Sequence, residues 1–253
     1  MNKVDVSIVI IARNEENNLR ECLESCSFAK EIILVDDNST DKTVEIAKEF
    51  GAKVYTRSLE GNWGAQQTFA IDKATCSWIF LIDADERCSD ALQNKIVDLV
   101  NKNDKFTYVI KRITKLRHYD IGHGPLRPDY VIRLMPNDGA RVDGYVHPQI
   151  ISKYPKQNIK EHIIHYSYTD WDQYYRKMNQ YGKLATDKYY KNGKKISFAA
   201  VIYKPVWAFI KVYFLNLGIL DGKMGYMLAA NHAAYTLQKY VRLYTLEKTK
   251  GLL

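Results

Sequence analysis

Short apolar runs alternate with amphipathic segments over the first hundred residues of the chain. The runs at 6–11, 32–35, 53–55 and 78–82 are bounded by polar residues, so each of them predicts a buried strand. The segments between these runs, and the one after Ser89, place apolar residues at helical spacing. This alternation predicts a parallel sheet with helices on both faces.

Local signals set the expected limits of two of these helices. Thr40 or Asp41 is expected to cap the second helix, whose buried face is predicted from its apolar positions (Val44, Ala47 and Phe50). Ser89 is expected to cap the fourth helix, with its apolar face at helical spacing (Leu92, Ile96 and Leu99).

The pattern changes at about residue 106. Residues 106–113, 130–135 and 159–165 are strand-like, and the loops between them are rich in Gly, Pro, His and Arg. Loops of this kind at the functional edge of a sheet usually carry substrate contacts, which we therefore expect here.

The chain is predicted to be helical from about residue 169. A Tyr- and Lys-rich helix is expected to run to about residue 191, and the apolar run 196–215 is interrupted by three residues (Lys204, Pro205 and Lys211). A central lysine costs about 2.5–3.5 kcal/mol on insertion scales, which favours an interfacial helix pair over a membrane span. An ordinary core helix with outward-reaching lysine stems has comparable weight.

Charge separates the two parts of the chain. Residues 160–253 hold 15 Lys and Arg against 6 Asp and Glu, whereas residues 1–159 hold 22 against 23. We therefore expect an α/β domain over 1–168 and a basic, aromatic helical extension over 169–253. The extension is expected to meet an anionic partner, such as a membrane surface, a nucleic acid or an acidic substrate.

The cysteines and the N-terminus favour a cytosolic setting. The four cysteines show no disulfide framework, and the chain enters a strand without the apolar region of a secretory signal. Cys22 and Cys26 lie four residues apart on a predicted helix, but no second Cys/His pair has the spacing of a zinc site.

The strongest chemical signal follows the fourth predicted strand. Asp83, Asp85 and Glu86 come directly after the apolar run. Ligands of open α/β sheets bind outside the carboxyl ends of the strands, and Mg²⁺ takes one or two carboxylates plus substrate phosphates. The stretch therefore predicts a metal-bound nucleotide.

Four motifs in order resemble those of family 2 glycosyltransferases with the GT-A fold. They are Ala12–Glu15, Val35–Asp41, Trp63–Gln67 and Leu81–Glu86. More narrowly, the chain resembles the bacterial subgroup that adds glucose or a related sugar to the inner core of lipopolysaccharide. The likeness continues more loosely to about residue 245 through three later segments (Val146-His147, Lys177–Tyr181 and Gly218–Gly222).

The resemblance implies an α/β GT-A fold with a C-terminal helical extension, and an inverting enzyme. The implied donor is a UDP-sugar, first of all UDP-glucose, with Mg²⁺ or Mn²⁺ as the cofactor. The implied acceptor is a glycan or glycolipid such as a lipopolysaccharide core. The implied location is the cytoplasmic face of the bacterial membrane, with the enzyme bound peripherally to its anionic surface.

Several residues take implied roles from the resemblance. The nucleotide and its sugar would be contacted by Ala12, Arg13, Glu15, Asp36, Asp37, Gln66, Gln67, Asp83 and Ala84. Asp85 would hold the metal with His165, and Asp83 would face the ribose or the metal. Alternatives stay open: residues 36–39 as a plain turn, Gln67 as a solvated helix residue, and Glu86 as a helix-start charge or a support.

The catalytic base is where the chain departs from the subgroup. A glutamate is expected directly after Val146-His147, but Pro148 follows. Asp143 is the first substitute, His147 the second and Asp129 the third, although Asp143 also suits a simple turn. Two arginines could bind diphosphate or an anionic acceptor, or be surface charges (Arg127 and Arg133).

Two other classes of protein match parts of the sequence. A sugar-1-phosphate nucleotidyltransferase would carry a Gly-rich loop after the first strand, where this chain has Ala12–Glu15 without a glycine. A non-catalytic binding protein for an anionic surface has only the basic charge in its favour, and nucleic-acid-binding motifs are absent from the sequence, so no nucleic acid is expected as a partner.

Overall fold

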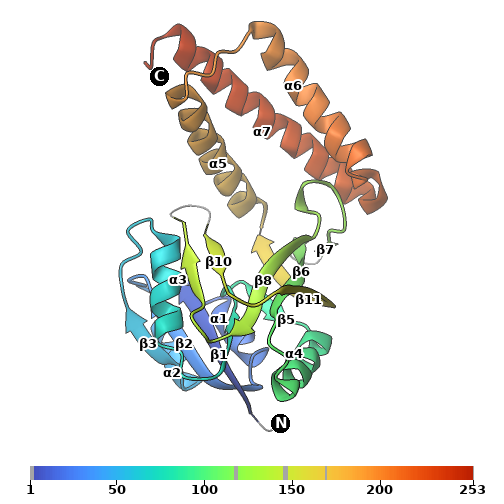
Figure 1. Ribbon diagram of the computed structural model, residues 1–253. Coiled ribbons are helices and arrows are strands. Elements are labelled where there is room, and N and C mark those ends of the chain that lie inside the picture. The colour runs from blue at the N-terminus through green and yellow to red at the C-terminus, as the bar shows by residue number, and fades with distance from the viewer. Residues whose placement is uncertain (1–2, 117–118, 145–147, 169, 253) are drawn as a thin grey trace. The chain divides into compact units, whose positions relative to one another are not determined.

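The computed structural model describes residues 3–116, 119–144, 148–168 and 170–252 (Figure 1). Contacts between residues divide the chain into two units. The first unit contains the residues up to 112 together with 129–165, and the second contains 113–128 together with the residues from 166 onward. Residues 113–128 were expected to belong to the α/β domain over 1–168, but they are grouped with the C-terminal helices.

The predicted parallel sheet is confirmed in the first unit. Strand β1 pairs in parallel with β2 and with β4, and β2 pairs in parallel with β3. These strands are β1 (Val4–Ala12), β2 (Ala29–Asp36), β3 (Lys53–Thr56) and β4 (Trp78–Leu81). The helices that connect and follow them are α1 (Leu19–Glu24), α2 (Thr43–Glu49), α3 (Trp63–Asp72) and α4 (Asp90–Lys102).

The later strands extend the same sheet in the order β3-β2-β1-β4-β8-β6-β11-β5, with β7 paired to β6. The three predicted strands are confirmed as β6 (Thr107–Leu116), β8 (Asp129–Pro136) and β11 (Lys156–Tyr168). Four short strands were not predicted: β5 (Glu86–Cys88), β7 (Tyr119–Asp120), β9 (Arg141–Asp143) and β10 (Gln149–Ile151). A 3₁₀ turn, Gly124–Leu126, follows β7.

The expected cap of α4 is confirmed, and that of α2 is corrected. Ser89 Oγ accepts from the Leu92 amide at 3.3 Å. Helix α2 begins only at Thr43, so Lys42 occupies the cap position, and Asp41 instead accepts from the Thr43 amide at 2.9 Å. The buried residues of α2 are Thr43, Ile46 and Ala47, whereas two of the predicted ones, Val44 and Phe50, are only half-buried.

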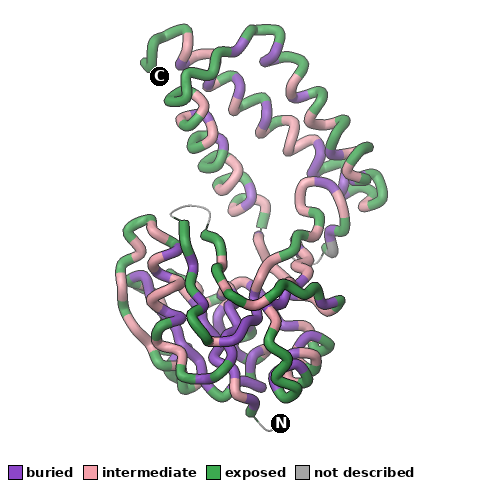
Figure 2. The backbone as a smooth tube through the Cα atoms, in the orientation of Figure 1, coloured by how far each residue is buried: buried purple, intermediate pink, exposed green. Residues whose placement is uncertain are grey.

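Both faces of β1, β2 and β4 are buried, as the apolar runs predicted. The edge strand β3 was expected to be buried too, but it is not: Lys53 and Thr56 are exposed, and Val54 and Tyr55 are only half-buried. Alternate side chains of a strand point to opposite faces of its sheet. In β4, Trp78 and Phe80 join one core cluster, whereas Ile79 and Leu81 join another. Figure 2 shows the buried residues concentrated along these strands. Because apolar side chains cover both faces of these strands, polar functional groups are expected at the strand ends.

The second unit is largely helical. Asp170 accepts from the Gln173 amide at 2.6 Å and caps the predicted helix α5 (Trp171–Lys191). Helix α6 (Phe198–Ile210) continues into a π-helical turn (Lys211–Leu215), and a 3₁₀ turn (Gly218–Asp221) leads into α7 (Gly222–Lys248).

One ion pair fastens the 113–128 segment to the start of α7. Asp221 accepts from the His123 amide at 2.9 Å and lies 2.8 Å from the Nδ1 atom of the same residue. The Gly124 amide of the same segment also donates to the Asn216 carbonyl oxygen at 2.9 Å, shortly before α7. These contacts explain why two segments far apart in sequence form one unit.

A buried carboxylate near the N-terminal end of β2 connects the neighbouring parallel strands. Glu31 on β2 accepts hydrogen bonds from Ser7 on β1, from Thr75 before β4 and from Lys53 on β3. Burial opposes its charge. The four donor groups (the hydroxyl of Ser7, the ammonium of Lys53, and the amide and hydroxyl of Thr75) nevertheless lower the pKa of Glu31 from about 4.5 to about 2. A lowered pKa stabilises the fold above pH 4.5, and this contribution is lost as the pH falls toward 2.

We therefore expect the free energy of unfolding of Glu31→Gln to be lower than that of the wild type by about 2–3 kcal/mol at pH 7. The difference should shrink between pH 4.5 and pH 2, as the wild-type carboxylate is protonated. Urea unfolding at several pH values measures it, with the exposed Glu24→Gln as the control. A difference that is the same at pH 7 and pH 3 would contradict this role.

Candidate functional site

Two turns at the carboxyl ends of β1 and β2 are interlocked by hydrogen bonds. Asn14 adopts a left-handed backbone with φ 56°, and its side-chain oxygen accepts from the Thr40 amide at 2.8 Å. The Asn14 amide donates to Ser39 Oγ at 2.9 Å, and the Glu15 amide donates to Thr43 Oγ1 at 2.7 Å. The motifs at 12–15 and 36–41 are therefore one structural unit.

The neighbouring carboxylates Asp36 and Asp37 have different surroundings. Both oxygens of Asp36 lie 3.2 Å from the Ser39 amide, so this residue shapes its own turn. Asp37 Oδ1 accepts from the Leu59 amide at 2.8 Å, and Oδ2 lies 3.3 Å from Arg13. The turn interpretation thus describes Asp36, whereas Asp37 is a fixed carboxylate beside an exposed guanidinium group.

The first turns of α3 carry buried groups with structural partners. Gln66 is fully buried, its Nε2 donates to the Arg57 carbonyl oxygen at 2.6 Å, and its Oε1 accepts from the Arg57 guanidinium at 3.0 Å. Its contact with a nucleotide stays a prediction. Both ends of its side-chain amide are already bonded to Arg57. Gln67, by contrast, is half-buried. Ala12 and Ala84 are both buried, so their backbone groups are what they can offer to a ligand.

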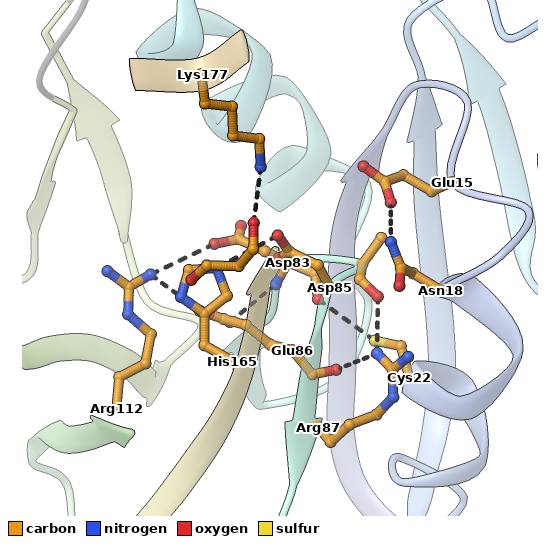
Figure 3. Close-up of polar contacts among 12 residues, drawn as sticks. Glu15, Asn18, Cys22, Asp83, Asp85, Glu86, Arg87, Arg112, His165 and Lys177 are labelled. Carbon is orange, nitrogen blue, oxygen red and sulfur yellow. Dashed lines mark hydrogen bonds and ion pairs between the residues drawn. The ribbon is translucent and has the colours of Figure 1, made fainter. Parts of the chain in front are cut away.

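Asp83 and Glu86 share one pair of arginines, Arg133 and Arg112. Figure 3 labels Arg112 beside the two carboxylates. Arg133 Nη2 lies 2.5 Å from Asp83 Oδ2 and 2.7 Å from Glu86 Oε1. Arg112 Nη1 lies 3.1 Å from the same Glu86 oxygen, and the Asp83 amide donates to Glu86 Oε2 at 3.0 Å. Glu86 is completely buried, so the alternative that it supports the site is the one that fits, and it does not begin a helix.

These contacts set the charges of the group. Burial would raise the pKa of Asp83, but Arg133 and then Arg112 hold it below its ordinary value. Burial raises the pKa of Glu86, and the two arginines only partly offset that rise. Burial would lower the pKa of Arg133, but Asp83 and Glu86 raise it, so its positive charge is secure. Among the described residues Arg133 Nε has no hydrogen-bond partner although it is buried.

Asp85 and His165, the two predicted metal ligands, lie together. His165 Nε2 is 3.3 Å from Asp85 Oδ2, and both side chains are largely buried (Figure 3). The contact follows from sheet pairing, because His165 on β11 is the register partner of Glu86 on β5. The pairing of β11 with β5 therefore brings together two residues that are 80 positions apart in the sequence.

The donor set of this pair suits a divalent cation. A carboxylate and an imidazole are both ligands of first-row divalent ions, and a Mg²⁺-type site leaves the remaining positions to phosphates and water. Within the described residues no three His, Cys, Asp or Glu side chains are grouped so that they could hold a metal alone. The residues therefore fit a metal that binds together with a diphosphate.

The three candidates for the catalytic base differ in what the structure gives them. Asp143 ends β9 with an exposed side chain, which accepts from the Gly144 amide at 2.8 Å. Both oxygens of Asp129 are held by Arg112, at 2.9 and 2.7 Å, which makes it a poor base. His147 lies outside the described residues.

The structure adds residues that the sequence analysis missed or left open. Arg112 was not predicted to be part of the site, and Arg133 was expected either to bind a ligand or to be a surface charge. In the structure Arg112 donates to Glu86, and Arg133 donates to Asp83. Arg133 is a charged residue inside the apolar run 130–135, and that interruption was a usable signal. Arg127 is exposed. All four cysteines are free and buried, as expected for a chain without a disulfide framework.

Comparison with known proteins gives a consistent family. The model of glycosyl transferase family 2 matches residues 7–134. The lipopolysaccharide core biosynthesis glycosyltransferase LpsC of Rhizobium meliloti is 30% identical, over 96% of this chain and 93% of its own length. An uncharacterized glycosyltransferase of Rickettsia typhi is 29% identical, over 94% of this chain and 85% of its own.

Two solved structures show distant likeness. The S. aureus TarS fragment 1–349 aligns with 99% of this chain and 92% of its own, at 12% identity and a TM-score of 0.42. Glucosyl-3-phosphoglycerate synthase of Mycobacterium tuberculosis, with Mn²⁺, UDP and glucosyl-3-phosphoglycerate, aligns with 44% of each chain at 20% identity and a TM-score of 0.37. The sequence relatives carry the family assignment without them.

The N-terminal end of α3 leaves no room for a side chain where it meets the Asp143–Gly144 turn. The Gly64 amide donates to the Gly144 carbonyl oxygen at 3.1 Å, and a Cβ on Gly64 would lie 2.6 Å from that oxygen. The contact is between backbones, so only movement of the turn relieves it. Gly64 therefore fixes the place of Asp143.

We expect Gly64→Ala to lower the melting temperature. With Asp143 as the predicted base, we also expect it to reduce kcat by about tenfold or more, because a shift of about 1 Å at a catalytic group is costly. Gly182→Ala is the control. A Cβ on this helical glycine would lie 3.4 Å from its nearest neighbouring atom, on the Tyr235 ring, which is an ordinary contact, and alanine favours a helix. Thermal unfolding and steady-state kinetics measure both variants. Equal behaviour of the two would mean that the turn tolerates the added methyl group.

Proposed function

Because the chain belongs to glycosyl transferase family 2, with the GT-A fold, we propose that it is an inverting enzyme that transfers a sugar from a UDP-sugar, with UDP-glucose first, to a hydroxyl group of a glycan or glycolipid such as a lipopolysaccharide core. The Asp85–His165 pair beside Asp83 is the observation that carries the proposal. The name of the relative from Rhizobium meliloti supports the class of acceptor.

In this proposal the interlocked turns bind the nucleotide. The backbone at Ala12, the side chains of Arg13 and Glu15, and the fixed carboxylate of Asp37 face the base and ribose, with Asp36 holding the turn in shape. A carboxylate accepts from the imide N–H of uracil, a donor that adenine lacks in that form. Gln67, Asp83 and Ala84 complete the contacts to the ribose and the sugar phosphate.

The diphosphate is the leaving group, and its charge must be neutralised. Asp85 and His165 would hold a Mg²⁺ or Mn²⁺ ion, which acts as a Lewis acid on the phosphate oxygens when it is bound. Asp83 is held in place by Arg133 and stays ionised through the low pKa described above. These side chains orient the donor while the acceptor hydroxyl attacks from the opposite face of the sugar.

Asp143 is our first choice as the base that removes the proton of the acceptor hydroxyl, and His147 is the second. A general base must come within hydrogen-bond reach of that proton. Asp143 has an exposed carboxylate, and its turn is fixed against Gly64 at the start of α3. Asp129 is set aside because its two oxygens are bound to Arg112.

We also propose that the enzyme works at the cytoplasmic face of the membrane. Helix α6 and the turns after it expose many large apolar side chains, among them Phe198, Ile202, Val206, Trp207, Phe214, Leu215 and Leu220. In the described residues, Phe198–Leu215 alone is long and apolar enough to cross a membrane, with a mean hydropathy of 1.5 and 28% of it buried. Its two lysines favour a helix that lies in the interface.

The transfer reaction is tested by following UDP release from a panel of UDP-sugars with Mn²⁺ and an acceptor. We expect EDTA to abolish the release, and Asp85→Asn to reduce it about 100-fold or more, because the diphosphate loses several kcal/mol of charge stabilisation. The exposed Asp98→Asn should keep wild-type activity. Metal-independent release, or Asp85→Asn with wild-type rates, would overturn the proposal.

A further inference from the structure

Three lysine side chains of the second unit surround one tyrosine ring. The ammonium groups of Lys194, Lys204 and Lys239 lie 5.9, 5.1 and 5.2 Å from the ring centre of Tyr240. Lys194 lies between α5 and α6, Lys204 is on α6, and Lys239 precedes Tyr240 on α7. The fold therefore brings three positive charges from separate segments to one place.

Other tyrosines support the same cluster. The ring of Tyr189 is stacked on that of Tyr240, with centroids 6.5 Å apart. Lys194 lies 3.9 Å and Lys239 5.8 Å from the centre of the Tyr189 ring, and Lys239 is also 5.0 Å from that of Tyr235. Tyr240 is buried, and Lys204 and Lys239 are half-buried, so the cluster has a firm base and a side open to solvent.

In the part of the chain that the structure describes, none of the three ammonium groups forms an ion pair with a carboxylate. Glu247 on the same helix accepts instead from the Ile196 amide at 2.9 Å. Burial lowers the pKa of Lys239, and the charges of Lys194 and Lys204 lower it further, with no acid acting in the other direction.

The rings offset only part of the repulsion. A cation–π contact with tyrosine contributes about 0.5–1 kcal/mol at an exposed site, and it does not neutralise charge. Three crowded ammonium groups are point donors of the kind that bind phosphate. We propose that Lys194, Lys204 and Lys239 form a binding site for a phosphate group.

The surroundings of the site favour a phosphate carried by a lipid. Two exposed aromatic residues of α6 lie near Lys204: Tyr203, whose ring centre is 5.3 Å from the Lys204 ammonium group, and Trp207, about one helical turn further on. The same helix exposes aliphatic side chains elsewhere on its surface, such as Ile202 and Val206. Aromatic and aliphatic side chains beside lysines are typical of helices that lie in the membrane interface, with the lysines at the phosphates. This lipid source rests on the proposed membrane location, whereas phosphate binding itself does not depend on it or on sugar transfer.

The lipid source is tested with the full chain, in EDTA and without a donor. Vesicles of phosphatidylglycerol and phosphatidylcholine are compared with vesicles of phosphatidylcholine alone by co-sedimentation. The variant carries Lys194→Gln, Lys204→Gln and Lys239→Gln, and its control carries Lys183→Gln, Lys188→Gln and Lys191→Gln, three exposed lysines of α5. We expect affinity for the anionic vesicles to fall about tenfold or more in the cluster variant and much less in the control.

The phosphate chemistry is tested separately with glycerol 3-phosphate. This soluble ligand should raise the melting temperature of the wild type and of the control, but not that of the cluster variant. Without ligand, the cluster variant should melt at or above the wild-type temperature, because repulsion is relieved. If the triple variant does not fold, Lys239→Gln alone replaces it in both experiments.

The outcomes separate the two proposals. Equal losses in the cluster variant and the control, or no response of the wild type to either phosphate, would overturn the phosphate site. A response to glycerol 3-phosphate without vesicle binding would keep the site and remove its lipid source. In that case the proposed membrane location fails, and the transfer reaction is untouched.

Discussion

The buried carboxylate of Glu86 is the contact on which the candidate site depends. One of its oxygens receives the Asp83 amide, the other receives Arg133 and Arg112, and its backbone lies opposite His165 in the sheet. Removing one partner of a buried ionic group is costly, about 3–5 kcal/mol, because the other charges stay buried and unpaired. Glu86 therefore fixes both sides of the site at once: the turn that bears Asp83 and Asp85, and the strand that bears His165.

The sequence predicted the parts of the structure that depend on periodicity and on local caps. Buried strands such as β4, the cap at Ser89, and the late helices all have such local signals. The α/β repeat also predicted that the carboxylates after β4 would lie at the carboxyl ends of the parallel strands. The resemblance to a known family then supplied the roles that spacing alone could not.

The sequence could not predict contacts between residues that are far apart and carry no periodic signal. Arg133 reaches Asp83 across 50 residues, and Gly64 is constrained by a turn 80 residues later. Glu86 resembled a helix-start charge because three residues of strand are too short to show an alternating pattern. Asp129 was a plausible base until its ion pair with Arg112 was visible. In each case a tertiary partner decides the role of the residue.

The central claim, that Glu86 positions the metal and nucleotide ligands, is tested most directly by calorimetric titration of UDP with Mn²⁺ into Glu86→Gln. We expect a folded protein whose affinity for UDP with Mn²⁺ is weaker by about 10- to 100-fold, as for other residues that orient metal ligands. Affinity for UDP measured in EDTA should change far less, and the exposed Glu45→Gln should match the wild type in both titrations. A folded Glu86→Gln that binds UDP with Mn²⁺ as tightly as the wild type would contradict the account.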